Sequence, residues 1–142
     1  MVGCAERKAY NKVKLAVIGA GLVGKKHIAL IRQSPICRLF CVVDPADKAR
    51  QLAAEIGVDW FSSVQDMCSQ TKIDGAIVAT PNQFHVDHGL LLISNGIPLL
   101  IEKPLASNVA GACQLVNAAT AANIPLLTGH HRRHNPLIQK AK

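Results

Sequence analysis

Three glycines near the start of the chain have the spacing of a phosphate-binding turn. The stretch GAGLVG places Gly19, Gly21 and Gly24 in a G-x-G-x-x-G pattern between a β-branched run and a helix-like segment. Without side chains there, the backbone can turn tightly, approach a pyrophosphate and pack helix on strand. The helix beginning at Leu22 and Val23 would present free N–H groups and a positive dipole end to phosphates. The pattern predicts dinucleotide binding, although glycines also close ordinary turns.

An acidic residue follows at a distance typical of dinucleotide-binding folds. Asp44 ends the second apolar run about 20 residues after Gly24, where a carboxylate would accept hydrogen bonds from the adenosine ribose. A carboxylate also repels a 2′-phosphate, and Pro45 rather than an arginine follows it. Both features favour NAD over NADP, although Lys48 and Arg50 lie close enough to weaken that preference.

The stretch ATPNQFH, residues 79–85, follows the fourth apolar run. In an open parallel sheet, ligands bind at the carboxyl ends of strands, near the point where the strand order reverses. We therefore expect Thr80, Pro81, Asn82 and His85 to border the cofactor crevice. The alternative is that residues 80–82 only turn the chain and cap the next helix, with His85 in solvent.

The fifth apolar run ends abruptly in two opposite charges and a proline. Glu102 and Lys103 should project over the crevice at its nicotinamide end, and Pro104 would fix the turn that aims them. The alternative is an ion pair on the surface at a strand end.

These residues must be positioned by an alternating series of strands and helices. Strands are predicted at 13–18, 38–43, 59–61, 73–79, 97–101 and 125–129, and helices at 22–33, 46–56, 63–70, 83–95 and 107–122. Gly57 and Gly96 are expected to close helices, and Ser107 or Asn108 to cap the last one. The alternation predicts an α/β fold, a doubly wound parallel Rossmann sheet of about six strands in the order 3-2-1-4-5-6.

The composition is that of a globular protein with a neutral body. The 142 residues suit one domain, and 49% of them are hydrophobic. The formal charge is +7, but residues 15–129 carry eight basic and eight acidic side chains, so the excess lies at the two ends. Without a basic stripe and with few aromatic residues for base stacking, we expect no nucleic-acid partner.

Other classes of protein and site are also disfavoured. No apolar run reaches the ~18 residues that cross a bilayer, so we expect no membrane partner. Five cysteines form no C-x-x-C pair and leave one over, as in reduced thiols, which predicts a cytoplasmic location. The histidines at 130, 131 and 134 lack a nearby carboxylate, so no metal site is expected.

Four motifs together resemble a known family. They are GAGLVGKKH (19–27), ATPNQFH (79–85), EKPLA (102–106) and GHHRRHNP (129–136). In this order they resemble the nucleotide-binding half of the Gfo/Idh/MocA family of glucose-fructose oxidoreductases and inositol dehydrogenases. The resemblance covers about residues 13–136. It implies NAD as cofactor, with NADP less favoured, and hydride transfer to or from a hydroxyl or carbonyl carbon of a sugar, cyclitol or related compound.

The resemblance also implies roles for the residues of the EKP motif. Lys103 would meet the reacting oxygen of the substrate, Glu102 would lie near the nicotinamide ribose, and the Lys103–Pro104 peptide is often cis in this family. A lysine can stabilise an alkoxide-like oxygen as a cation or as a proton donor. His134 stands where the family's R-[FY]-x-P pattern has an aromatic residue.

The expected organisation is a tail at 1–12, a Rossmann domain at 13–130, and at 131–142 the start of a connection to an absent C-terminal α/β domain. In the family that domain supplies most of the substrate pocket, the oligomer interface and an Asp/His pair. We therefore expect this chain to bind the cofactor with little or no turnover, and a homo-oligomer only in a full-length protein. Two alternatives are a non-catalytic nucleotide-binding or sensing module and a Rossmann domain for coenzyme A or S-adenosylmethionine.

Overall fold

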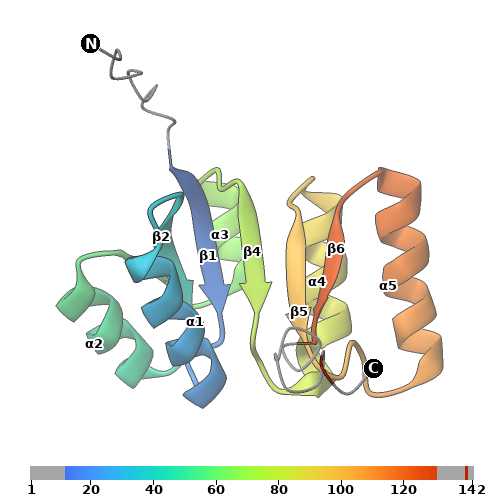
Figure 1. Cartoon of the computed structure of the whole chain (residues 1–142), viewed down its shortest axis with the longest axis horizontal. Coiled ribbons are helices and arrows are strands. Elements are labelled where there is room, and N and C mark those ends of the chain that lie inside the picture. Colours follow the sequence, from blue (N-terminus) through green and yellow to red (C-terminus); the bar gives the residue numbers. More distant parts are fainter. Residues whose placement is uncertain (1–11, 131–139, 141–142) are drawn as a thin grey trace, which may run out of the picture.

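A single parallel sheet forms the centre of the molecule (Figure 1). The computed structural model describes residues 12–130 and residue 140. The strands are β1 (Val13–Ile18), β2 (Cys37–Val43), β3 (Asp59–Phe61), β4 (Gly75–Val78), β5 (Leu99–Glu102) and β6 (Leu126–Gly129). Their spatial order is β3-β2-β1-β4-β5-β6, and every pairing is parallel. The predicted Rossmann fold and strand order are confirmed.

Helices cover both faces of the sheet. They are α1 (Leu22–Gln33), α2 (Asp47–Ile56), α3 (Val64–Gln70), α4 (His85–Ser94) and α5 (Val109–Ala122), and a short 3-10 helix, η1 (Asn82–Phe84), precedes α4. In Figure 1, α1 and α2 lie in front of the sheet, and α3 and α4 lie behind it. The chain therefore changes faces after β3, which brings the two halves of the sheet together at β1 and β4.

The strand sequences are apolar throughout because both of their faces are buried. In β1, Ala16 and Ile18 belong to the core on the side of α3, α4 and α5, whereas Val17 belongs to the core under α1 and α2. All three side chains are at most 1% exposed. This two-sided burial is typical of a parallel sheet covered by crossover helices.

Helix ends follow the predicted signals. Gly57 and Gly96 have positive φ angles of 72° and 71°, as expected for residues that end helices. Of the two residues predicted to cap the last helix, Asn108 does so, because its side chain accepts a hydrogen bond of 2.8 Å from the Gly111 N–H.

The structure differs from the predicted boundaries around β4 and β5. The segment predicted as one helix at 83–95 starts with a 3-10 turn, in which the Phe84 N–H donates to the Pro81 carbonyl oxygen. The fifth strand begins at Leu99 rather than residue 97, because Pro98 has no N–H to donate to a neighbouring strand. These differences leave the strand ends that border the site in place. No helix in the described ranges has the length and apolar character needed to cross a membrane.

Candidate cofactor-binding site

The glycine-rich turn joins β1 to α1 and lies against two neighbouring strands. Gly19 has a φ of +90°, and a Cβ there would lie 2.8 Å from backbone atoms of Ala79 and Thr80. A Cβ at Gly24 would collide with the carbonyl oxygen of Gly19. The Gly19 N–H also donates to the carbonyl oxygen of Val43 over 2.8 Å. Only glycine at these two positions permits so tight a turn.

The start of α1 leaves room for an anion. A Cβ built at Gly21 meets nothing within 4 Å, so the space beside this residue is open. The side chains of Leu22 and Val23 are exposed, and no acidic residue stands in the first turn. The first N–H groups of a helix have no intrahelical partners, and they carry the positive end of the helix dipole. This open, electropositive backbone fits a pyrophosphate.

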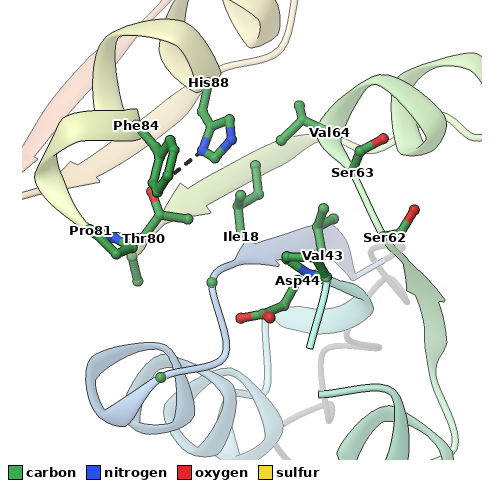
Figure 2. A pocket seen from close by; sticks show the side chains of 14 residues that line it. Ile18, Val43, Asp44, Ser62, Ser63, Val64, Thr80, Pro81, Phe84 and His88 are labelled. Atoms are coloured by element: carbon green, nitrogen blue, oxygen red, sulfur yellow. Dashed lines mark hydrogen bonds between the residues drawn. The ribbon is translucent and has the colours of Figure 1, made fainter. Parts of the chain in front are cut away.

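Asp44 lies at the carboxyl end of β2, beside the glycine-rich turn (Figure 2). One carboxylate oxygen accepts a 2.8 Å hydrogen bond from the Ala20 N–H, and the other accepts a 2.9 Å bond from the Ala46 N–H. The carboxylate thus holds the turn to the second strand. Each oxygen retains a lone pair, so the group can still accept bonds from ribose hydroxyls.

A cavity of about 530 Å³ opens where β1 to β4 end. Figure 2 shows Asp44 on one side of it and Thr80, Pro81 and Phe84 on the other. The wall between them is apolar, and it is formed by Ile18, Val43 and Val64. A flat apolar base would fit this wall, with its ribose beside the carboxylate.

Three polar residues that line this cavity were not predicted from the sequence. Ser62 and Ser63 follow β3, and His88 lies on α4. The His88 ring stacks on Phe84 with centroids 5.9 Å apart, and its Nδ1 lies 3.4 Å from the Thr80 hydroxyl. Burial lowers the pKa of His88, which favours a neutral ring. Phe84 and His88 lie four positions apart, a spacing that brings side chains together on a helix. This spacing, just after a strand end, could have identified His88 as a residue of the site.

A second cavity of about 370 Å³ lies on the other side of the β4 end. Its lining includes the predicted residues Asn82, His85, Glu102 and Lys103, together with Val23, Lys26 and His27 from α1. Both cavities share Ala79, Thr80 and Pro81. The structure therefore brings most of the predicted residues together in two adjoining spaces along the carboxyl edge of the sheet, whereas Leu22 and Gly24 line neither of them.

The EKP turn closes the second cavity at the end of β5. Glu102 contacts His27, with 2.8 Å between Oε1 and Nε2, and its Oε2 accepts a 3.3 Å bond from the Lys103 N–H. The Lys103 side chain is exposed and lines the cavity. The Lys103–Pro104 peptide is cis. Among the described residues, the carboxylate contacts a histidine and forms no ion pair with the adjacent Lys103 ammonium.

His85 is 1% exposed and holds two segments of the site together. Its Nδ1 lies 2.8 Å from the carbonyl oxygen of Pro104, and its Nε2 lies 2.8 Å from the carbonyl oxygen of Thr80. The ring therefore bridges the loop after β4 and the turn after β5. The alternative of a solvated histidine is wrong. With both nitrogens occupied, the ring offers no polar atom to a cofactor.

Arg50 of α2 packs against Trp60, next to the end of β2. Its guanidinium lies over the Trp60 ring, 5.5 Å from the centroid, and the Trp60 indole N–H donates to the Asp44 carbonyl oxygen over 2.9 Å. A cation–π contact of this kind favours the position of the Arg50 side chain over the Trp60 ring of β3.

Residues 12–130 and 140 contain no group of three or more His, Cys, Asp or Glu side chains that could hold a metal ion. His131 and His134, which entered the sequence argument about metals, lie outside the described residues.

The cysteines of the described part are free thiols, and burial raises the pKa of Cys41 to about 12. Such a thiol stays protonated and packs as a small apolar side chain.

A Rossmann sheet with a glycine-rich first turn and an acidic end to its second strand defines a dinucleotide-binding domain, and this chain is of that class. More narrowly, the chain belongs to the Gfo/Idh/MocA oxidoreductase family, because the model of that family's NAD-binding Rossmann fold matches residues 13–130. The resemblance inferred from the four motifs is confirmed, and NAD is the cofactor of this fold.

The similarity extends to characterised proteins and solved structures. Rhizopine catabolism protein MocA of Rhizobium meliloti is 28% identical over 93% of this chain and 42% of its own length. The scyllo-inositol 2-dehydrogenase (NAD(+)) of Bacillus subtilis is 29% identical over 93% of this chain and 40% of its own length. The WlbA dehydrogenase of Bordetella pertussis, crystallised with NADH and UDP-GlcNAcA, is 28% identical and superimposes with a TM-score of 0.89, over 93% of this chain and 41% of that chain. The chain spans about 40% of the length of these relatives.

Proposed function

We propose that this chain binds the cofactor for an oxidoreductase that transfers a hydride between nicotinamide and a hydroxyl or carbonyl carbon of a sugar, a cyclitol or a related compound. The observation that carries the proposal is the pair of cavities that share Ala79, Thr80 and Pro81, with Asp44 in one and Lys103 in the other. A dinucleotide has two nucleosides joined by a pyrophosphate. The open space beside the start of α1 suits the pyrophosphate, and each cavity suits one nucleoside. The inositol dehydrogenase and WlbA relatives support this class of substrate.

The residues proposed to bind NAD act through three kinds of contact. The turn and the start of α1 hold the pyrophosphate by backbone N–H groups, and Asp44 accepts bonds from the adenosine ribose. Thr80, Pro81 and Asn82 separate the two nucleosides, and Glu102 faces the nicotinamide ribose. The turn residues are Gly19, Gly21, Leu22, Val23 and Gly24. We assign His85 an indirect part, which is to hold the Thr80 and Pro104 carbonyls in place.

Lys103 is the proposed catalytic residue of this half of the site. NAD, when bound, supplies the hydride acceptor or donor at the nicotinamide ring. The Lys103 ammonium lines the same cavity and would hold the substrate oxygen as its charge changes, either as a cation or by giving and taking a proton. The pairing of Glu102 with His27 supports this role, because the neighbouring carboxylate does not occupy the lysine.

We propose that the chain prefers NAD to NADP. A 2′-phosphate at the first cavity would lie beside the Asp44 carboxylate and meet charge repulsion. Arg50, a nearby cation that could offset this repulsion, lies on the Trp60 ring.

The chain alone is proposed to bind NAD with little or no turnover. Its matched relatives are more than twice as long as the part that it shares with them. In our proposal, a C-terminal domain completes the substrate side of the second cavity and provides the surface of a homo-oligomer. A cytoplasmic location is proposed from the cysteine spacing.

The experiment that tests the proposal is a calorimetric titration of this chain with NADH, NADPH and coenzyme A. We expect NADH to bind most tightly, and Lys103→Ala to retain that binding because the lysine faces the substrate. If coenzyme A binds and NADH does not, the dinucleotide assignment is wrong.

The alternative function is a non-catalytic nucleotide-binding or sensing module. It predicts that Lys103 has no effect on any reaction. An assay of NADH formation from scyllo-inositol, carried out with Lys103 and with Lys103→Ala in the complete protein, separates the two functions. Loss of the reaction with retained NADH binding supports the enzyme.

A further inference from the structure

The carboxylate of Glu102 is fixed from three directions. His27 on α1 lies 2.8 Å from Oε1, and the backbone N–H of Lys103 donates to Oε2 over 3.3 Å. On the third side stands Gly129 of β6, the register partner of Glu102 across the sheet. A Cβ at Gly129 would lie 2.9 Å from both Cδ and Oε1 of the glutamate. Residues from three elements thus converge on one side chain of the second cavity.

The absence of a side chain at Gly129 is explained by this contact and not by the backbone. Among the described residues, the glycines with positive φ are Gly19, Gly57 and Gly96, so Gly129 adopts a conformation that other residues accept. In the part of the chain that the structure describes, the three atoms nearest to a Cβ built there all belong to Glu102. Glycine at this position therefore provides the room in which the carboxylate turns toward His27.

The contact between His27 and Glu102 faces the second cavity and not the interior of the core. Their side chains are 20% and 16% exposed, so neither is sealed from a ligand. Both residues line the second cavity. A histidine that occupies one carboxylate oxygen restricts rotation of the group and leaves the remaining lone pairs of the other oxygen for a ligand.

We propose that His27 and Gly129 are positioning residues that aim the Glu102 carboxylate at the nicotinamide ribose. This inference rests on the proposed function, since it requires NADH to reach the second cavity. The adenosine half of the cofactor, which lies in the first cavity, is independent of both residues.

The test compares NADH with ADP, which carries only the adenosine half and its phosphates. For His27→Leu and for Gly129→Ala we expect NADH affinity to fall about tenfold, the effect of losing a hydrogen bond to a charged group. Affinity for ADP should stay within about twofold of the unmodified chain in both variants, a difference too small to reflect a lost contact. His27→Gln retains an N–H donor of similar reach and should restore most of the NADH affinity. Gln33→Leu, an exposed substitution on the same helix, is the matched control.

Two results would overturn the positioning role. One is unchanged NADH affinity in both variants, and the other is an equal loss of ADP affinity, which would indicate general damage to the fold. If the unmodified chain binds ADP and no NADH, the proposed function fails, and a measurement on the free chain then tests only whether His27 and Gly129 fix the Glu102 carboxylate. The ¹⁵N resonance of His27 Nε2 is expected to shift in both Gly129→Ala and Glu102→Gln. An unshifted resonance in Gly129→Ala contradicts the inference whatever the cofactor does.

Discussion

At the scale of single residues, several polar side chains of this site bind backbone. Asp44 bonds the N–H groups of Ala20 and Ala46, and His85 contacts the carbonyl oxygens of Thr80 and Pro104. Each of these two side chains connects the segment that follows one strand to the segment that follows a different strand. The positions of the ligand-facing loops therefore depend on a few hydrogen bonds that the sequence pattern does not reveal.

Replacing His85 with leucine should destabilise the protein. An imidazole with one N–H donates to one of the two carbonyl oxygens, so the substitution removes one donor, and an unsatisfied buried acceptor costs about 1–3 kcal/mol. We expect the free energy of unfolding in urea to fall by about 1–3 kcal/mol. Gln83→Leu, at an exposed position two residues earlier, serves as the control. Equal stability of the two variants would mean that the His85 contacts do not hold the loops.

His88 should make stability depend on pH in the weakly acidic range. Burial lowers its pKa below the ordinary value of 6.5, and the nearby His85 adds to this effect while Asp87 opposes it. The unfolded chain therefore binds a proton at pH values where the folded chain does not. The contribution is complete above about pH 6.5 and is lost as the pH falls through the lower folded-state pKa. Urea titrations should show a smaller fall in stability between about pH 7.5 and 5 for His88→Gln; identical falls would refute this role.

At the scale of elements, we expect two glycines of the turn between β1 and α1 to have different roles, Gly24 in packing and Gly21 in binding. A methyl group at Gly24 would meet the Gly19 carbonyl oxygen and force α1 away from the turn, whereas one at Gly21 would enter open space. We expect Gly24→Ala to lower the free energy of unfolding by about 1–3 kcal/mol, as overpacking does. Gly21→Ala should keep the stability and lose NADH affinity, because its methyl group would enter the open space in which we propose that the pyrophosphate binds.

Thermal unfolding and NADH titration of both glycine variants check this assignment. The two substitutions are chemically identical and lie three positions apart, so each is the control for the other. Full NADH affinity in Gly21→Ala would show that the pyrophosphate does not lie at the start of α1.

The elements themselves were largely predictable, and the contacts between them were not. Continuous apolar runs alternating with helical segments are sufficient to predict a parallel sheet, and the G-x-G-x-x-G turn places its ligand edge. The partner of Glu102 is His27, which lies 75 positions away on α1. The apolar spacing of that helix does not predict which strand end it will lie beside. His88 was missed for a similar reason, since its burial depends on the loop that ends at Thr80.

At the scale of the whole molecule, two cavities lie on either side of the point where the strand order reverses. The first lies over the ends of β1, β2 and β3, and the second lies between α1 and the end of β5. The end of β4 separates them and contributes to both. This arrangement suits a ligand with two similar halves, and in our proposal the reactive half lies beside Lys103.

The central claim is that NAD spans both cavities, and amide chemical shifts of the ¹⁵N-labelled chain test it most directly. With ADP, we expect shifts at Asp44, Ser62, His88 and the glycine-rich turn at 19–24, and none at Asn82 or Lys103. With NADH, the same amides should shift together with those of Asn82 and Lys103 in the second cavity. If NADH shifts the first group alone, the second cavity is not the nicotinamide site and the account is contradicted.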